Sequence, residues 1–154
     1  MKKATLILAS ILMMTACSQP KNPFLQEWNT PYGTAPFSQI TEADYLPAIQ
    51  EGLKQQKAEI QAIIDCPDAP TFENTIAAYE LSGGLLAKVT GVFYNISESD
   101  ATPAIQALVD EVTPIMTAAE DDIFMNAAFF ARVKAVYENR ASLDREQQMV
   151  TEKL

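Results

Sequence analysis

The chain has 154 residues, of which 48% are hydrophobic and 20% are charged, which is typical of one globular domain rather than of a disordered segment. Its net charge of -9 repels phosphate backbones, so we expect no nucleic-acid partner. The sequence contains no histidine. A histidine general base, a Ser-His-Asp arrangement and a His-ligated zinc site are therefore excluded within this chain, and we expect no catalytic and no metal-binding residues in it.

The N-terminus has the pattern of an export signal. Lys2 and Lys3 precede an apolar run over residues 4–14 that is too short to span a bilayer, and Thr15 and Ala16 stand directly before Cys17. This pattern predicts a signal peptide over residues 1–16. The cysteine after it resembles the bacterial lipobox, in which that thiol receives a lipid. An ordinary cleaved signal peptide and a short N-terminal anchor are the alternatives.

The lipoprotein interpretation makes Cys17 the lipidation site and predicts a membrane partner through the lipid anchor. Ser18 follows the cysteine instead of an aspartate, which favours the outer membrane in bacteria with two membranes. We therefore expect the protein in the cell envelope, facing the periplasm or the outside. Cys66, the other cysteine, is then unpaired, and we expect an inert thiol there.

Residues 17–40 are predicted to form a lipidated tether and an extended arm. The segment holds several prolines and shows little apolar periodicity. It also carries apolar side chains that are unusual in a free linker, namely Phe24, Leu25, Trp28, Tyr32 and Phe37. We therefore expect the arm to pack along a larger body.

From residue 41 onward the pattern is helical. The run Thr41-Glu42-Ala43-Asp44 is typical of a helix start with Thr41 as the N-cap. Pro47 belongs in a first turn, so a start of the main helix near Tyr45 or Leu46 is the alternative. Its apolar stripe, at steps of three and four residues, is Leu46, Ile49, Leu53, Ile60, Ile63 and Ile64. The stretch from Cys66 to Pro70 ends it.

The second helix is predicted to start at the N-cap Thr71 and to carry an apolar face from Phe72 to Ile96. Gly83, Gly84 and Gly91 lie inside this pattern. Either the helix breaks near Gly83 and Gly84, or it is continuous and its glycines admit a neighbouring backbone closely. We favour the continuous helix.

Three further helix starts follow. Thr102 with Pro103 opens the third helix, Asn126 caps the fourth, and Asp144 with Gln147 forms a capping box for the fifth. Residues 41–154 show no strand-like alternation, so the expected fold class is all-α, with about five helices after the arm. The last helix has barely begun at Leu154, so we expect the helical region 41–154 to be truncated at its C-terminal end.

Several polar clusters have a functional and a structural interpretation. The run Glu120, Asp121 and Asp122 points in three directions on a helix, so a solvated face is favoured over a metal site. Glu98 and Asp100 lack calcium-loop spacing, and capping accounts for them. Glu73 and Asn74 can be offered as substrate contacts, but completion of a helix N-terminus by Thr71 and Glu73 is favoured.

The motifs in their order along the chain resemble a known family. The most specific are the runs Tyr45-Leu46-Pro47-Ala48-Ile49 and Thr71-Phe72-Glu73-Asn74-Thr75. Asn22-Pro23-Phe24-Leu25, Val92-Phe93-Tyr94-Asn95 and Phe130-Ala131-Arg132-Val133-Lys134 accompany them. From about residue 22 to the end, the chain is similar to the N-terminal region of bacterial dipeptidyl carboxypeptidases, which are peptidyl-dipeptidases among the thimet-oligopeptidase-like zinc metallopeptidases.

The resemblance implies the function of a larger protein. Enzymes of this family are large, mostly helical bodies in which a His-Glu-x-x-His helix and a further glutamate bind zinc, and they release C-terminal dipeptides from short peptides. None of those zinc or catalytic residues has a counterpart here. The expected role is a non-catalytic helical portion that walls the substrate channel, inactive alone, with the missing C-terminal catalytic region as partner. The alternative is a stand-alone helical lipoprotein that binds a peptide or protein without catalysis.

Overall fold

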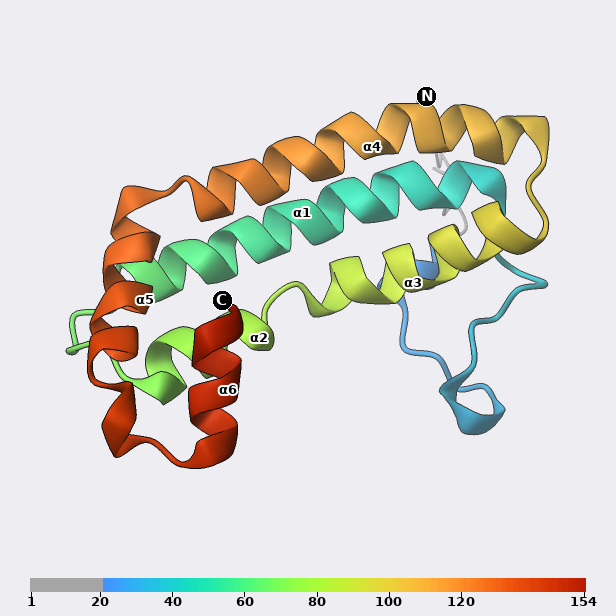
Figure 1. The fold of residues 1–154 in the computed structure, drawn as a ribbon. Coiled ribbons are helices and arrows are strands. Elements are labelled where there is room, and N and C mark those ends of the chain that lie inside the picture. The colour runs from blue at the N-terminus through green and yellow to red at the C-terminus, as the bar shows by residue number, and fades with distance from the viewer. Residues whose placement is uncertain (1–20) are drawn as a thin grey trace, which may run out of the picture.

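The computed structural model describes residues 21–154, and within that range it contains helices and turns but no β-strand. The α-helices are α1 (Glu42–Ile64), α2 (Ala78–Glu80), α3 (Gly84–Ser99), α4 (Pro103–Phe124), α5 (Ala127–Glu138) and α6 (Arg145–Lys153). The long helices α1, α3 and α4 pack against one another as rods, and α2, α5 and α6 gather toward one end of them (Figure 1). The predicted all-α fold class is confirmed.

The predicted export segment lies outside the part of the chain that the structure describes. Residues 1–16 and the lipidation site Cys17 are outside the described residues, so both remain predictions. Within residues 21–154, no helix combines the length and the apolar character needed to cross a membrane.

Helix α1 begins earlier than its proline indicated. Thr41 and Asp44 form a capping box, in which the Thr41 backbone N–H and hydroxyl both donate to the Asp44 carboxylate, at 2.8 and 2.7 Å. The helix starts at Glu42, and Pro47 lies in its second turn. The helix start at the Thr41 cap is therefore confirmed, and the alternative start near Tyr45 or Leu46 is wrong. The proline removes one backbone donor close to the helix start, a loss that a capped helix of 23 residues tolerates.

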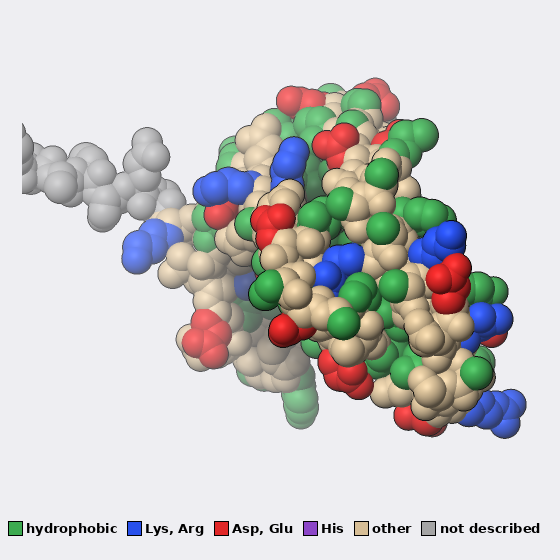
Figure 2. All heavy atoms as spheres, turned by 90° about the vertical axis from the view of Figure 1, so that its left-hand side faces the viewer, with side chains coloured by type: hydrophobic (Ala, Val, Ile, Leu, Met, Phe, Trp, Pro, Cys, Tyr) green, Lys and Arg blue, Asp and Glu red, His purple; other side chains and the backbone are tan. Residues whose placement is uncertain are grey.

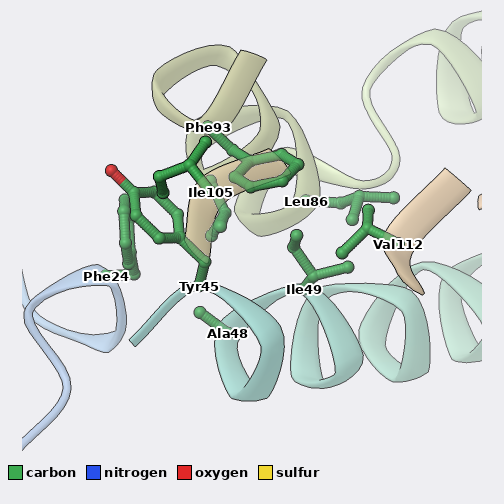
Figure 3. Close-up of a cluster of buried hydrophobic side chains, with 9 residues drawn as sticks. Phe24, Tyr45, Ala48, Ile49, Leu86, Phe93, Ile105 and Val112 are labelled. Atoms are coloured by element: carbon green, nitrogen blue, oxygen red, sulfur yellow. The ribbon is translucent and has the colours of Figure 1, made fainter. Parts of the chain in front are cut away.

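The main core lies between α1, α3, α4 and the arm. Tyr45 packs between Phe24 and Phe93, with ring centroids 5.2 and 5.3 Å away, and its hydroxyl points away from the cluster (Figure 3). Helices α1 and α3 approach each other closely at Gly52, where an added Cβ would lie 2.9 Å from the Leu86 Cα. The fully buried side chains around this contact include Ile49, Val89 and Val112.

The expected second helix is broken. A π-helical segment over Phe72–Ala77 runs into α2, a turn follows, and α3 starts at Gly84. Gly83 has a φ of 71°, in the left-handed region that favours glycine, and its N–H donates to the Glu59 carboxylate at 2.7 Å. The continuous helix that we favoured is therefore wrong, and the break near Gly83 and Gly84 is confirmed. The glycine that admits a neighbouring backbone is instead Gly52 of α1.

The three later helix starts are confirmed by their hydrogen bonds. The Thr102 hydroxyl accepts from the Ile105 N–H at 3.1 Å, and Pro103 is the first residue of α4. The Asn126 side chain accepts from the first turn of α5, and the Asp144 carboxylate accepts from the Gln147 N–H at 2.8 Å. These caps are local, which explains why the sequence located them well.

A second, smaller core lies at the end of α1. It joins Ile60 and Ile63 of α1 to Phe129 of α5, and Leu154 after α6 packs against it. Tyr79 closes it from the side, with its ring centroid 5.3 Å from that of Phe129. The two clusters explain how one long helix, α1, holds together elements that are far apart in the sequence.

Candidate functional site

The arm is fastened to α1 and α3 by one aromatic side chain and one lysine. Phe24 is fully buried, which confirms that the arm packs on a larger body. Lys88 of α3 donates from Nζ to the carbonyls of Phe24 and Gln26, at 2.9 and 2.7 Å, and lies 4.2 Å from the centre of the Trp28 ring. The outer part of the arm does not pack, since Tyr32 is fully exposed and Phe37 is 56% exposed.

A hollow of about 640 Å³ opens beside this attachment. Burial lowers the pKa of Lys88, whose ammonium bonds only to carbonyls and faces the Trp28 ring. Hydrogen bonds from Gln55 and Lys54 lower the pKa of the Glu51 carboxyl on the same hollow. Both groups already bond to other groups of the chain, so their polar contacts serve to hold the arm and the surface of α1.

A buried arginine joins α5 to the loop after α1. Arg132 is 9% exposed, and its Nη1 donates to the backbone carbonyls of Cys66 and Asp68, at 2.9 and 3.3 Å. Its Nη2 donates to the Asn74 side-chain oxygen at 3.2 Å, while its Nε has no hydrogen-bond partner. The guanidinium thus replaces backbone pairing in a loop with two prolines, which is a structural role.

Asn74 is the polar centre of the Thr71–Thr75 motif. Its side-chain oxygen accepts from the Thr71 N–H at 2.8 Å, the Thr75 hydroxyl at 2.9 Å and Arg132, and its amide group donates to the Ala69 carbonyl at 3.0 Å. Completion of the helix N-terminus by Thr71 is confirmed, but Asn74 is its partner and Glu73 is exposed. The motif therefore binds its own loop. Both polar atoms of the Asn74 side chain form hydrogen bonds with other residues of the chain.

No structural role was predicted for Arg132, although its position in the helical pattern of α5 indicates one. Arg132 lies three residues after Phe129 and four before Val136, both buried, so it falls on the apolar stripe of α5. A charged residue on such a stripe needs an internal partner. Its partners come from residues 66–74, and no helical pattern in the sequence places that loop beside α5.

The structure also describes the acidic run of α4 and the polar residues at the end of α3. Glu120, Asp121 and Asp122 are exposed on α4, and Asp122 lies 3.8 Å from Lys57. Near the end of α3, the Ser97 and Ser99 hydroxyls donate to carbonyls of the preceding helical turn. Within the part of the chain that the structure describes, no three histidine, cysteine, aspartate or glutamate side chains are grouped so that they could hold a metal ion.

Two apolar hollows adjoin each other where α5 meets α6. The larger, about 410 Å³, is lined on its apolar side by Phe130, Val133, Tyr137 and Leu154. The smaller shares Phe130, Val133 and Leu154 and adds Phe124 from the end of α4. Phe130 is 60% exposed, so this end of the molecule presents aromatic surface to solvent. Such an arrangement favours the binding of another apolar surface.

No family model matches the chain. The chain is 40% identical over 122 residues to the dipeptidyl carboxypeptidase of Salmonella typhimurium, which covers 79% of this chain and 18% of that protein. It is 39% identical over 129 residues to the dipeptidyl carboxypeptidase of Escherichia coli, which covers 84% of this chain and 19% of that protein. The chain thus spans about a fifth of the length of the curated relatives it matches.

An identity near 40% across about four fifths of the chain makes it a peptidase-related protein. Its relatives are bacterial dipeptidyl carboxypeptidases, and the resemblance inferred from the motifs is confirmed.

Proposed function

We propose that this chain is the N-terminal, non-catalytic helical portion of a zinc-dependent peptidase that releases C-terminal dipeptides from short peptides. One observation carries the proposal: 79–84% of this chain aligns with dipeptidyl carboxypeptidases, but the match covers only 18–19% of those proteins. The sequence contains no histidine, so a zinc site of the kind used by metallopeptidases does not fit the residues of this chain. The zinc ligands and the group that activates water then belong to the region outside the match.

The contribution of this chain is a rigid wall rather than a reacting group. The arm is attached through Lys88 and Phe24, α1 and α3 are in backbone contact at Gly52, and Arg132 ties the loop before α2 to α5. In this proposal, the wall limits which substrates reach an enclosed site of the whole enzyme, so that short peptides enter it. The comparisons give no support to the alternative of a stand-alone binding lipoprotein.

The location belongs to the same proposal. We infer that the signal peptide is removed before Cys17, that the thiol is lipidated, and that the anchor holds the enzyme in the cell envelope, at the outer membrane. Support comes from the basic start, the short apolar run and the small residues before Cys17.

The test is an activity comparison of two polypeptides from the same gene context. One is the 154-residue chain, and the other continues past codon 154 as far as the reading frame allows. We expect no dipeptide release by the short chain from an N-terminally blocked short peptide, because it lacks the zinc ligands. We expect release by the longer polypeptide, loss of that release with a chelator, and recovery with added zinc, all followed by chromatography of the products.

Two results would contradict the proposal. The first is dipeptide release by the short chain itself. The second is a folded longer polypeptide that has no His-Glu-x-x-His segment and releases no dipeptide. A matched control is the longer polypeptide with a Glu98→Gln substitution, which changes an exposed side chain of α3 and should leave the rate unchanged.

A further inference from the structure

The two apolar hollows at the α5–α6 end form one surface, which we call the terminal apolar face: Phe124, Phe130, Val133, Tyr137, Thr151 and Leu154. Three of these side chains are aromatic and substantially exposed, with Phe130 at 60%, Phe124 at 47% and Tyr137 at 41%. A cluster of exposed aromatic side chains around a hollow is the usual centre of a protein interface. Figure 2, which views the α5 end of the molecule, shows hydrophobic side chains at the surface among charged ones.

The charges around the terminal apolar face are paired with one another. Lys134 lies 3.6 Å from Glu138 along α5, and the Arg140 Nε lies 3.1 Å from the Glu152 carboxylate. The Arg140 guanidinium also stacks 3.8 Å from the centre of the Tyr137 ring. Because these pairs neutralise the rim, the face offers no excess positive charge to lipid headgroups or phosphates. An apolar centre with a neutral polar rim matches another protein surface instead.

We propose that the terminal apolar face is the surface on which the catalytic region of the same peptidase polypeptide docks. This inference rests on the proposed function. More than four fifths of each relative lies outside the match, so a large body of polypeptide is present in those proteins to cover it. Leu154 itself lines both hollows. In a polypeptide that continues past this residue, the next residues start within the face and need no linker to reach it.

The experiment measures how fast single cysteines on and off the face react with a bulky thiol reagent. The background is Cys17→Ser with Cys66→Ser in both the 154-residue chain and the longer polypeptide, and any cysteine encoded past codon 154 is also replaced by serine. Phe130→Cys reports on the terminal apolar face, and Glu98→Cys reports on an exposed position of α3 that lies outside it. We expect both cysteines to react readily in the short chain. In the longer polypeptide, Phe130→Cys should react at least about tenfold more slowly, and Glu98→Cys should change by less than about twofold.

Equal reactivity of Phe130→Cys in the two polypeptides would overturn the inference. So would protection that already appears in the short chain and rises with its concentration, because the face would then bind a second copy. Protection in the short chain that needs added lipid vesicles would likewise assign the face to a membrane. Tyr137→Cys, at 41% exposure on the same face, repeats the measurement if the Phe130 variant does not fold.

Dipeptide release by the longer polypeptide separates the two proposals. Release together with an unprotected Phe130→Cys leaves the proposed function standing and removes the docking surface. A folded longer polypeptide without release, in which Phe130→Cys is nevertheless protected, removes the peptidase function but keeps the face as an intramolecular interface.

Discussion

Arg132 shows how a single buried charge can organise a loop. Its guanidinium is nearly enclosed, it has no acidic partner among the hydrogen bonds and ion pairs of residues 21–154, and it bonds to two backbone carbonyls and the Asn74 side chain. Those carbonyls belong to a segment between two helices that contains Pro67 and Pro70. Prolines cannot donate, so the carbonyls of such a loop depend on side-chain donors.

Replacing this arginine should destabilise the fold. We expect Arg132→Met, which keeps the length of the side chain but removes the donors, to lower the free energy of unfolding by about 1–3 kcal/mol, because buried acceptors lose their partners. Arg132→Lys should lose less, since an ammonium can still reach one acceptor. Urea unfolding followed by far-UV circular dichroism measures both.

The matched control for this substitution is Arg145→Met. Arg145 is exposed at the start of α6, so its replacement should change the free energy of unfolding by no more than about 0.5 kcal/mol. Equal stabilities of the Arg132→Met and Arg145→Met variants would show that the buried guanidinium contributes nothing to the loop.

At the scale of the elements, glycines have different structural roles because their surroundings differ. Gly52 lies in α1 directly against the backbone of α3, whereas Gly91 lies inside α3 with nothing within 4 Å of an added Cβ. Gly83 is a third case, since its positive φ ends one helical segment before α3 begins. Gly52 therefore allows a close contact between two helices, Gly91 weakens the interior of α3, and Gly83 forms the break before α3.

Alanine substitutions at Gly52 and Gly91 should change the free energy of unfolding in opposite directions. Gly52→Ala places a Cβ 2.9 Å from the Leu86 Cα, so α1 and α3 must separate. We expect a loss of about 1–3 kcal/mol in the free energy of unfolding. Gly91→Ala should instead raise it by about 0.5–1 kcal/mol, because alanine loses less backbone freedom in a helix. Thermal unfolding of both variants provides the measurement, and a destabilised Gly91→Ala would refute this account of the α3 surface.

At the scale of the whole molecule, the arm connects the helical body to the proposed membrane anchor. The Asn22 side chain donates to the Asp44 carbonyl at 2.7 Å, so the chain is attached to the body from residue 22 onward. Only residues 18–21 then separate the proposed lipidation site from that attachment. A spacer this short would hold the helical body close to the membrane surface.

Lipidation can be tested with the two cysteines of the chain. Cys17→Ser should abolish the incorporation of labelled fatty acid and move the protein out of the membrane fraction, because each buried CH2 of a lipid chain contributes about 0.8 kcal/mol to membrane binding. Cys66→Ser is the control and should keep both the label and the membrane location. Labelled fatty acid in the Cys17→Ser variant would show that the anchor lies elsewhere or does not exist.

The sequence by itself determined the features that depend on near neighbours. The caps at Thr41, Thr102, Asn126 and Asp144, the apolar stripes and the all-α class all follow from side chains within about one helical turn of each other. The resemblance to dipeptidyl carboxypeptidases was likewise readable from contiguous motifs, and the comparisons confirm it. The π-helical segment and the break at Gly83 could not be predicted, because they involve distant partners, namely Arg132 for Asn74 and Glu59 for Gly83.

The tertiary structure alone decided which surfaces are covered. It placed Arg132 against residues 66–74 and buried Phe24, whose carbonyl accepts from Lys88. It left Phe130 exposed to solvent, although Phe129 beside it is buried. Helical periodicity tells which side chains share a face, but the position of every other element decides whether that face meets a neighbour. For this reason the exposure of the terminal apolar face and the contact of Arg132 with residues 66–74 depend on how the helices pack together.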